Sequence, residues 1–293
     1  MRNHVFGFLL WLAAVLGVFS SPLSRLIWQA LHEGYTSHIV LIPPLICFLI
    51  WSRRDAIFAS INYSVVRGIE IAAFGVLAGG IAFGVKLENT SSLIPLLTVL
   101  SVLLLVIAGF VLFFGTRAIA RAAFPIALLV FILPIPGVLI DNIIRFLQAR
   151  STDLSAWAFS VLGVPVLREG FVLTMPEVSI EIAKECSGIN SSIALLIIML
   201  LIAHETLHTT WRRVLLVLIT IPLSIIKNAM RIMTLTMLAS RIDPSFLSGR
   251  LHHDGGFVFY LLSLALVYPV WKLLHATETS QDIRAAEQRA FTA

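Results

Sequence analysis

The chain has 293 residues, of which 58% are hydrophobic and only 13% are charged, and its mean hydropathy is +0.95. A water-soluble domain cannot bury so large an apolar fraction and keep a polar exterior, so this composition excludes a soluble protein. The net charge of +5 then indicates the orientation of a membrane protein, and we expect no nucleic-acid partner. Of the two cysteines, Cys47 lies inside an apolar run, which we interpret as packing, so no disulfide framework is expected.

Apolar stretches along the whole chain predict an all-α polytopic membrane protein with about eight transmembrane helices. The first stretch follows Met1 and Arg2 and could be a signal peptide, but we interpret it as a retained helix. The expected spans are residues 5–20, 36–51, 68–86, 93–114, 118–135, 188–205, 214–239 and 256–274.

Basic residues predict the orientation of these spans. In an eight-span arrangement, pairs such as Arg53/Arg54 and Arg212/Arg213 fall on the same side as both termini, and the side richer in Lys and Arg is the cytoplasm. We therefore expect a multi-pass protein of the inner (plasma) membrane, in contact with the lipid bilayer, with both termini in the cytoplasm.

One sizeable stretch, residues 136–187, is predicted to lie outside the spans. Pro134 and Pro136 break the fifth apolar stretch, and residues 138–162 have the pattern of an amphipathic helix. From Val164 onward the hydrophobic period shortens towards two, which predicts a short β-hairpin element on the extracytoplasmic side. Its edge could accept an extended peptide as an added strand.

Cys186 is predicted to lie where this element enters the sixth span. Ser187 and Gly188 suit the start of a helix, and the unpaired N–H groups at a helix N-terminus lower the pKa of a thiol. Because the thiolate is the attacking form of cysteine, Cys186 is a candidate nucleophile. The alternative is a small buried residue.

Arg231 lies within the seventh span, about 17 residues past Val214, which places it roughly 26 Å along the helix. That depth is near the outer boundary of the membrane, where Cys186 is also expected. An arginine inside a span costs free energy and by default indicates a functional site, although snorkelling is the alternative. Its guanidinium could stabilise an oxyanion or hold a carboxylate. Asn228 shares its helix face, and we expect it to orient Arg231 or a substrate carbonyl.

His252 and His253 end the outer loop before the last span, next to Gly255 and Gly256. Glycines permit close backbone approach. A histidine here could take the proton of a nearby thiol and later protonate a leaving amine.

A competing motif, His204-Glu205-x-x-His208, matches the pattern of zinc hydrolases. It lies at the cytoplasmic end of a span, is followed by Arg212 and Arg213, and has no evident third ligand. We therefore expect no metal and no cofactor, and keep a zinc-dependent intramembrane protease as an alternative. A second alternative is a non-enzymatic transporter or scaffold in which Arg231 binds an anionic lipid or solute.

Several short motifs occur together from about residue 130 to 275. They are Leu133-Pro134, residues 163–170, Glu185-Cys186-Ser187-Gly188, Asn228-Ala229-Met230-Arg231, and His252 with Gly256. In this order and spacing the chain resembles the exosortase/archaeosortase family of membrane-embedded cysteine transpeptidases, which sort proteins of the PEP-CTERM type.

The resemblance implies a catalytic site of Cys186, Arg231 and His252, supported by Asn228. His252 stands four residues before Gly256, as the family's histidine does before its glycine, but His253 remains an alternative. The resemblance covers about residues 130–275, and the first four spans match only as hydrophobic segments. We expect one integral membrane domain over residues 1–293, with a four-span region (1–130), a catalytic core (131–275) and a cytoplasmic tail (276–293).

The expected reaction is that of a cysteine peptidase or transpeptidase acting at the periplasmic face. Its substrates would be exported proteins with a C-terminal sorting signal, made of a motif, a transmembrane helix and a basic tail. The Cys186 thiolate attacks the scissile carbonyl, Arg231 stabilises the oxyanion and His252 protonates the leaving amine, although Arg231 and His252 could exchange roles. A glycan or lipid acceptor, or water, then resolves the thioester.

Overall fold

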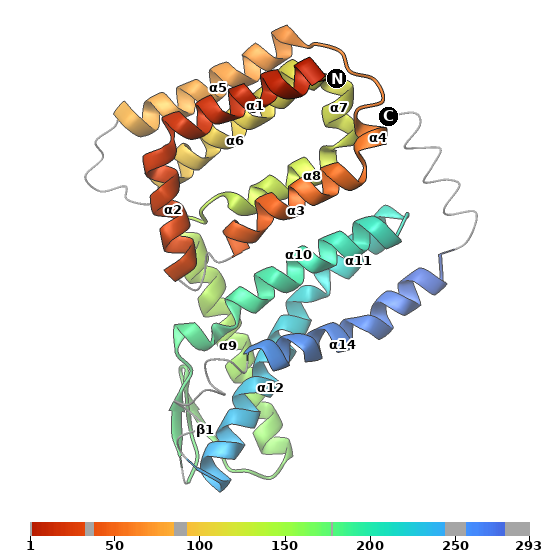
Figure 1. Cartoon of the computed structure of the whole chain (residues 1–293). Helices are drawn as coiled ribbons and strands as arrows, with labels where there is room; N and C mark the ends of the chain where they lie inside the picture. Colours follow the sequence, from red (N-terminus) through yellow and green to blue (C-terminus); the bar gives the residue numbers. More distant parts are fainter. Residues whose placement is uncertain (1, 33–37, 85–92, 177, 244–255, 279–293) are drawn as a thin grey trace. The chain divides into compact units, whose positions relative to one another are not determined.

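The computed structural model describes residues 2–32, 38–84, 93–176, 178–243 and 256–278 (Figure 1). The chain forms two compact units, Met1–Ile140 and Asp141–Ala293, and the boundary falls within the first turn of helix α9 (Gly137–Val161). Helices dominate both units, so the predicted all-α polytopic class is confirmed.

The first unit consists of helices in its described residues. In chain order they are α1 (Arg2–Val18), α2 (Ser20–His32), α3 (His38–Ser52), α4 (Arg54–Ile57), α5 (Val65–Gly84), α6 (Leu93–Phe114), α7 (Thr116–Arg121), α8 (Ala123–Ala127) and the 3₁₀ helix η2 (Leu128–Ile132).

Close packing of α5 on α6 depends on glycine. A Cβ atom on Gly79 would come within 2.7 Å of Ser101 Oγ, and one on Gly75 within 3.0 Å of Leu105 Cγ. Gly75 and Gly79 are one helical turn apart, the spacing of small residues that lets membrane helices approach closely. The buried Ser101 hydroxyl donates to the Gly75 carbonyl at 2.7 Å, which joins the two helices by a hydrogen bond.

Within the described residues, five helices are long and apolar enough to cross a membrane: α5, α6, α10, the combined segment Thr210–Arg241, and residues Phe257–Ala276. The count rises to seven if two bent pairs each form one span; these are α1 with α2, bent by 78°, and Ala123–Ile132 with α9, bent by 91°. The predicted span 36–51 corresponds to the shorter apolar helix α3. Its Cys47 is exposed rather than packed in the core, which corrects the packing interpretation.

The second unit consists of helices with a small sheet at one end. After α9 its elements are β1 (Leu167–Glu169), β2 (Val172–Thr174), β3 (Ser179–Glu181), the 3₁₀ helix η3 (Lys184–Ser187), α10 (Ile189–Thr206), α11 (Thr210–Leu218), α12 (Thr220–Arg241) and α14 (Gly256–Ala276).

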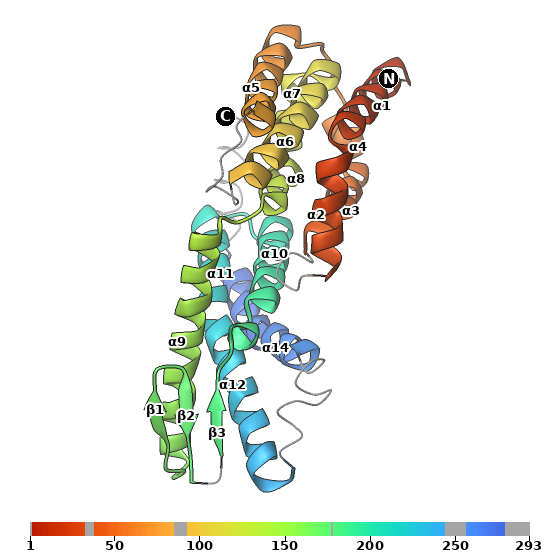
Figure 2. The ribbon, with the colours of Figure 1, turned by 90° about the vertical axis from the view of Figure 1, so that its left-hand side faces the viewer.

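The three strands form an antiparallel sheet in the order β1-β2-β3. Leu167 pairs with Thr174 across the first hairpin, and Val172 pairs with Glu181 across the second. Figure 2 shows the strands beside α9 and α12. The predicted amphipathic helix and short β element before Cys186 are thus both confirmed.

Two apolar clusters hold the second unit together. The first, the sheet cluster, joins Phe159 of α9, Leu173 of β2 and Ile232 of α12. The second is formed by residues of α10, α11, α12 and α14, with Leu195, Met199 and Leu216 fully buried. The sheet cluster positions the segment that carries Cys186.

Candidate active site

Cys186 lies in the single 3₁₀ turn η3, between strand β3 and helix α10. Its backbone N–H donates to the Ala183 carbonyl at 3.0 Å, and its partly buried side chain packs against the sheet cluster. Gly188 then adopts the left-handed conformation, with φ +73°, and caps the start of α10. The predicted position of Cys186 at the entry to a helix is therefore what the structure shows.

Asn228 of α12 holds the backbone beside Cys186. Its Nδ2 donates to the Cys186 carbonyl at 2.9 Å, and the residue is only 1% exposed. We expected this amide to orient Arg231 or a substrate carbonyl, whereas its Nδ2 binds the main chain of the candidate nucleophile. Within the described residues its buried Oδ1 accepts no hydrogen bond.

Gly188 is required here for a second reason besides its positive φ. A Cβ atom on Gly188 would lie 3.0 Å from Asn228 Oδ1 and 3.3 Å from Lys227 Nζ. A side chain would thus press on the contact that fixes the Cys186 carbonyl.

Lys227 is a buried cationic residue that sequence analysis did not assign to the site. It is 2% exposed, and its Nζ donates to the Ser191 hydroxyl. Ser191 and Ser192 in turn donate to the Gly188 carbonyl at 3.0 and 2.8 Å. The signal in the sequence is a lysine inside an apolar span, which needs a polar partner, but the identity of that partner depends on the fold.

Arg231 lies on α12 one turn after Asn228 and is partly buried. The next residue, Ile232, belongs to the sheet cluster against which Cys186 packs. The structure therefore brings the helix that carries Arg231 against the Cys186 turn, through Asn228. His252 and His253 lie outside the described residues.

Helix α9 supports this arrangement through its polar face. Buried Gln148 donates from Nε2 to the Ile182 carbonyl at 2.8 Å, and buried Ser155 donates to the Ala229 carbonyl at 3.4 Å. These bonds fix the end of β3 and the main chain of α12. By contrast, apolar Leu139 and Trp157 of α9 are exposed. The spacing of Gln148, Thr152 and Ser155 on one helix face is the signal that could have revealed these contacts.

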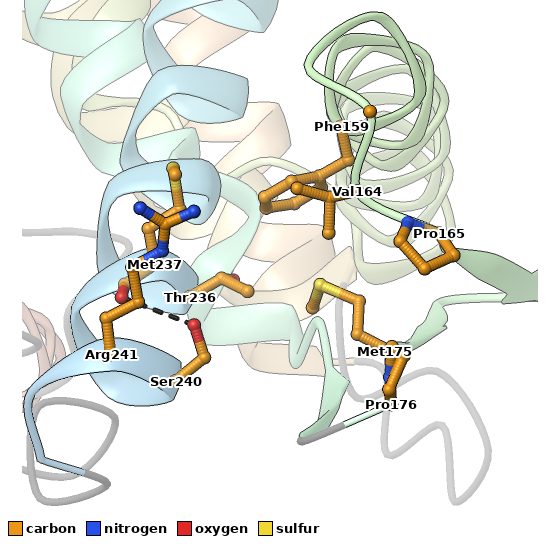
Figure 3. Close-up of a pocket in the computed structure, with 10 residues that line it drawn as sticks. Phe159, Val164, Pro165, Met175, Pro176, Thr236, Met237, Ser240 and Arg241 are labelled. Carbon is orange, nitrogen blue, oxygen red and sulfur yellow. Dashed lines mark hydrogen bonds between the residues drawn. The ribbon is translucent and has the colours of Figure 1, made fainter.

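A cavity of about 260 Å³ opens next to the sheet cluster (Figure 3). Its walls come from the end of α9 and the residues after it, from the β2–β3 turn and from the last turns of α12. In Figure 3 Thr236 of α12 lies opposite Met175 across the cavity. Sequence analysis did not predict this cavity.

His204, Glu205 and His208 do not share one helix. Helix α10 ends at Thr206, and Leu207 is extended, so His208 lies beyond the helix that carries His204. His208 instead lies beside Glu278, with 3.4 Å between its Nδ1 and Glu278 Oε2. The described residues contain no group of three or more His, Cys, Asp or Glu that could hold a metal ion. This geometry gives the zinc alternative no support.

Glu278 binds the start of α11. Its Oε1 accepts the backbone N–H groups of His208 and Thr209 at 2.9 and 2.7 Å. Burial alone would raise the pKa of Glu278, but hydrogen bonds from Thr209 and His208 outweigh burial and hold that pKa below its usual value. The Arg212 guanidinium also lies 3.9 Å from Oε1, so this carboxylate ties the end of α14 to the α10–α11 connection.

Comparison with protein families gives a match over most of the chain. The model of the transmembrane exosortase family (Exosortase_EpsH) matches residues 27–269, which include Cys186, Asn228, Arg231 and His252. No curated protein and no solved structure matches the chain.

Proposed function

Because the chain belongs to the transmembrane exosortase family, we propose that it is a membrane-embedded cysteine transpeptidase that cleaves C-terminal sorting signals of exported proteins. The family itself indicates a transmembrane transpeptidase in protein sorting. The observation that carries the finer assignment is the Cys186 turn, which directly precedes α10 and is tied by Asn228 to the helix bearing Arg231.

The proposed reaction starts from the Cys186 thiolate. Sγ attacks the scissile carbonyl carbon, and the carbonyl oxygen becomes an oxyanion that the Arg231 guanidinium stabilises. When the carbon–nitrogen bond breaks, His252 gives a proton to the leaving amine and a thioester remains on Cys186. An acceptor nucleophile from a glycan or lipid, or water, then attacks the thioester and releases Cys186.

Asn228 is proposed to act on the nucleophile rather than on the substrate. By holding the Cys186 carbonyl, it limits the positions that Sγ can take. Placement of a reacting atom within about 1 Å is worth up to roughly 10²-fold in rate. His252 precedes the start of α14 by four residues, and His253 is the alternative proton donor.

The proposed orientation in the membrane rests on the basic residues, which are enriched on the cytoplasmic side. We place the protein in the inner membrane with both termini in the cytoplasm and the Cys186 turn at the extracytoplasmic face. The small sheet before Cys186 would then lie where an exported substrate can reach it.

The proposal is tested by co-expression with a tagged candidate substrate that carries a motif, a transmembrane helix and a basic tail. The wild type is expected to shorten this substrate, and Cys186→Ala is expected to abolish shortening. Cys47→Ala is the matched control, because it removes the other cysteine of the chain and is expected to process normally. A hydroxylamine-sensitive thioester with the substrate should form in the wild type and should not form in Cys186→Ala.

Full processing by Cys186→Ala would overturn the cysteine mechanism. Loss of processing on addition of a chelator would instead favour the zinc alternative built on His204, Glu205 and His208.

A further inference from the structure

We propose that the cavity beside the sheet cluster is a substrate subsite that binds an apolar side chain of an extended peptide, with an acidic residue two positions before it. The proposal rests on the proposed function, because it assumes a peptide substrate that reaches Cys186. It adds a binding site and Arg241 as its specificity-determining residue.

The walls of the cavity are suited to an apolar side chain of variable shape. Phe159 and Val164 form one side, Met175 and Pro176 come from the β2–β3 turn, and Met237 comes from α12 (Figure 3). Methionine side chains are flexible and polarisable, so they adapt to differently shaped apolar groups. Ligand sites of this kind are mostly apolar, with a few polar groups that fix orientation.

The charge of Arg241 at the edge of the cavity selects the peptide residue near the bound apolar side chain. Arg241 is the one charged side chain among the residues that line the cavity. It is exposed, and within the part of the chain that the structure describes it makes no ion pair or hydrogen bond through its side chain. A guanidinium binds a carboxylate with two parallel hydrogen bonds, so an acidic peptide side chain fits this rim and a basic one does not.

The position of the subsite relative to the nucleophile follows from α12. Asn228 contacts the Cys186 carbonyl, and Met237 and Arg241 follow Asn228 by nine and thirteen positions in the same helix. At about 1.5 Å per helical residue these offsets correspond to roughly 13 and 20 Å. An extended peptide advances about 3.3 Å per residue. Because the transmembrane helix of the proposed substrate follows the scissile bond, the apolar side chain lies about four residues before that bond and the acidic one about six residues before it.

The test measures binding of synthetic peptides to the full chain carrying Cys186→Ala, held in phosphatidylcholine nanodiscs. The probes are three fluorescein-labelled Gly/Ser dodecapeptides with one Val, preceded two residues earlier by Glu, Gln or Lys. Fluorescence anisotropy should show the Glu peptide binding about two- to fivefold more tightly than the Gln peptide, the range expected for an exposed ion pair. The Lys peptide should bind most weakly.

Two variants distinguish the contribution of the apolar wall to peptide binding from that of Arg241 at the edge of the cavity. Arg241→Glu should reverse the order, so that the Lys peptide binds best. Met237→Trp should fill the cavity and weaken all three peptides. Arg25→Glu, an exposed charge reversal in the first unit, is the matched control and should leave the order unchanged.

An unchanged order in Arg241→Glu would overturn the proposal, as would equal binding of all peptides by the Met237→Trp and parent chains. If phosphatidylglycerol displaces the peptide, and does so only when Arg241 is present, the cavity binds a lipid headgroup and the proposal is overturned. Failure of the proposed function is distinguishable, because it would show as absent Cys186-dependent processing while the peptide order persists.

Discussion

The two units of the chain bury different kinds of side chain. Among the described residues, Thr98 and Ser101 are the buried polar residues of the first unit, whereas the second unit buries Lys227, Asn228, Gln148 and nine others, including Arg212. In the first unit the Ser101 hydroxyl joins two helices through the Gly75 carbonyl. In the second unit, by contrast, the side chains of Asn228, Gln148 and Ser192 donate to the main-chain carbonyls of Cys186, Ile182 and Gly188.

The difference indicates that buried residues of the first unit serve helix packing, whereas buried polar residues of the second unit serve to position a main-chain turn. A buried polar group costs free energy unless it is hydrogen-bonded, so a cluster of such groups is retained where it positions something. The first unit needs small residues that let helices approach, and the second needs fixed donors around one turn. Substitutions of similar physical size in the two units should therefore differ in their effect on processing.

The sharpest contrast is between two glycines. Gly188→Ala forces a side chain into a left-handed conformation, at about 1–2 kcal/mol, and presses on Asn228 Oδ1. We expect a loss of roughly 100-fold in processing, because the Cys186 turn must shift. The measurement is the rate of substrate shortening, with thermal unfolding recorded in parallel.

Gly80→Ala in α5 is the matched control, since a Cβ atom there meets nothing within 4 Å. It should leave processing unchanged and stabilise the helix by up to about 1 kcal/mol. Equal processing by Gly188→Ala and wild type would contradict the role of this turn.

The second contrast pairs Asn228→Ala with Ser101→Ala. Each removes a buried donor to a main-chain carbonyl, and each should lower the free energy of unfolding by about 1–3 kcal/mol. Only Asn228→Ala should slow processing, by about tenfold or more, because its acceptor is the Cys186 carbonyl. Matched losses of processing in both variants would mean that stability alone explains the effect.

A smaller effect is expected from Gln148→Leu. The substitution leaves the Ile182 carbonyl without its 2.8 Å donor, four residues before Cys186. Processing should fall by a few-fold, and the free energy of unfolding by about 1–2 kcal/mol. Asn142→Leu is the control on the same helix, because Asn142 is exposed and bonds only to Arg145 within the described residues. It should process normally.

Local signals predicted much of the fold. The prolines at 134 and 136 marked the 91° bend before α9, the shortened period marked the strands, and Gly188 marked the start of α10. These features depend on neighbouring residues, so a sequence read alone contains them. For α9 the same reasoning considered only the apolar positions. It overlooked the polar face, which contacts the end of β3 and the main chain of α12.

Long-range partners could not be predicted. Lys227 and Ser191 are 36 positions apart, and Asn228 and Cys186 are 42 positions apart. No periodicity links such pairs, since their approach depends on how α10 and α12 cross. The resemblance to a family predicted that Cys186, Asn228 and Arg231 belong to one site, but the bond from Asn228 to the Cys186 carbonyl is visible only in the structure.

The smallest predicted effect tests the polar cluster at the other end of the second unit. Glu278 accepts two backbone N–H groups at the start of α11, and its pKa in the folded state is held below its usual value. A depressed carboxyl pKa contributes stability above the unfolded-state value, and that stability is lost as the pH falls through the folded-state pKa. Glu278→Gln should therefore lower the free energy of unfolding by about 1 kcal/mol at neutral pH, and the difference from wild type should shrink in acid.

Thermal unfolding between neutral pH and about pH 3, a range that spans the usual carboxyl pKa values, measures this difference. Asp55→Asn, which changes an exposed carboxylate of the first unit, is the control and should leave the unfolding temperature unchanged at neutral pH. Because Glu278 lies far along the chain from Cys186 and contacts none of the residues around it, substrate processing should not change. A fall in processing with Glu278→Gln would show that the polar groups around Glu278 are coupled through α10 to those around Cys186. It would then be wrong to assign the Cys186 groups to the proposed chemistry and the Glu278 groups to stability alone.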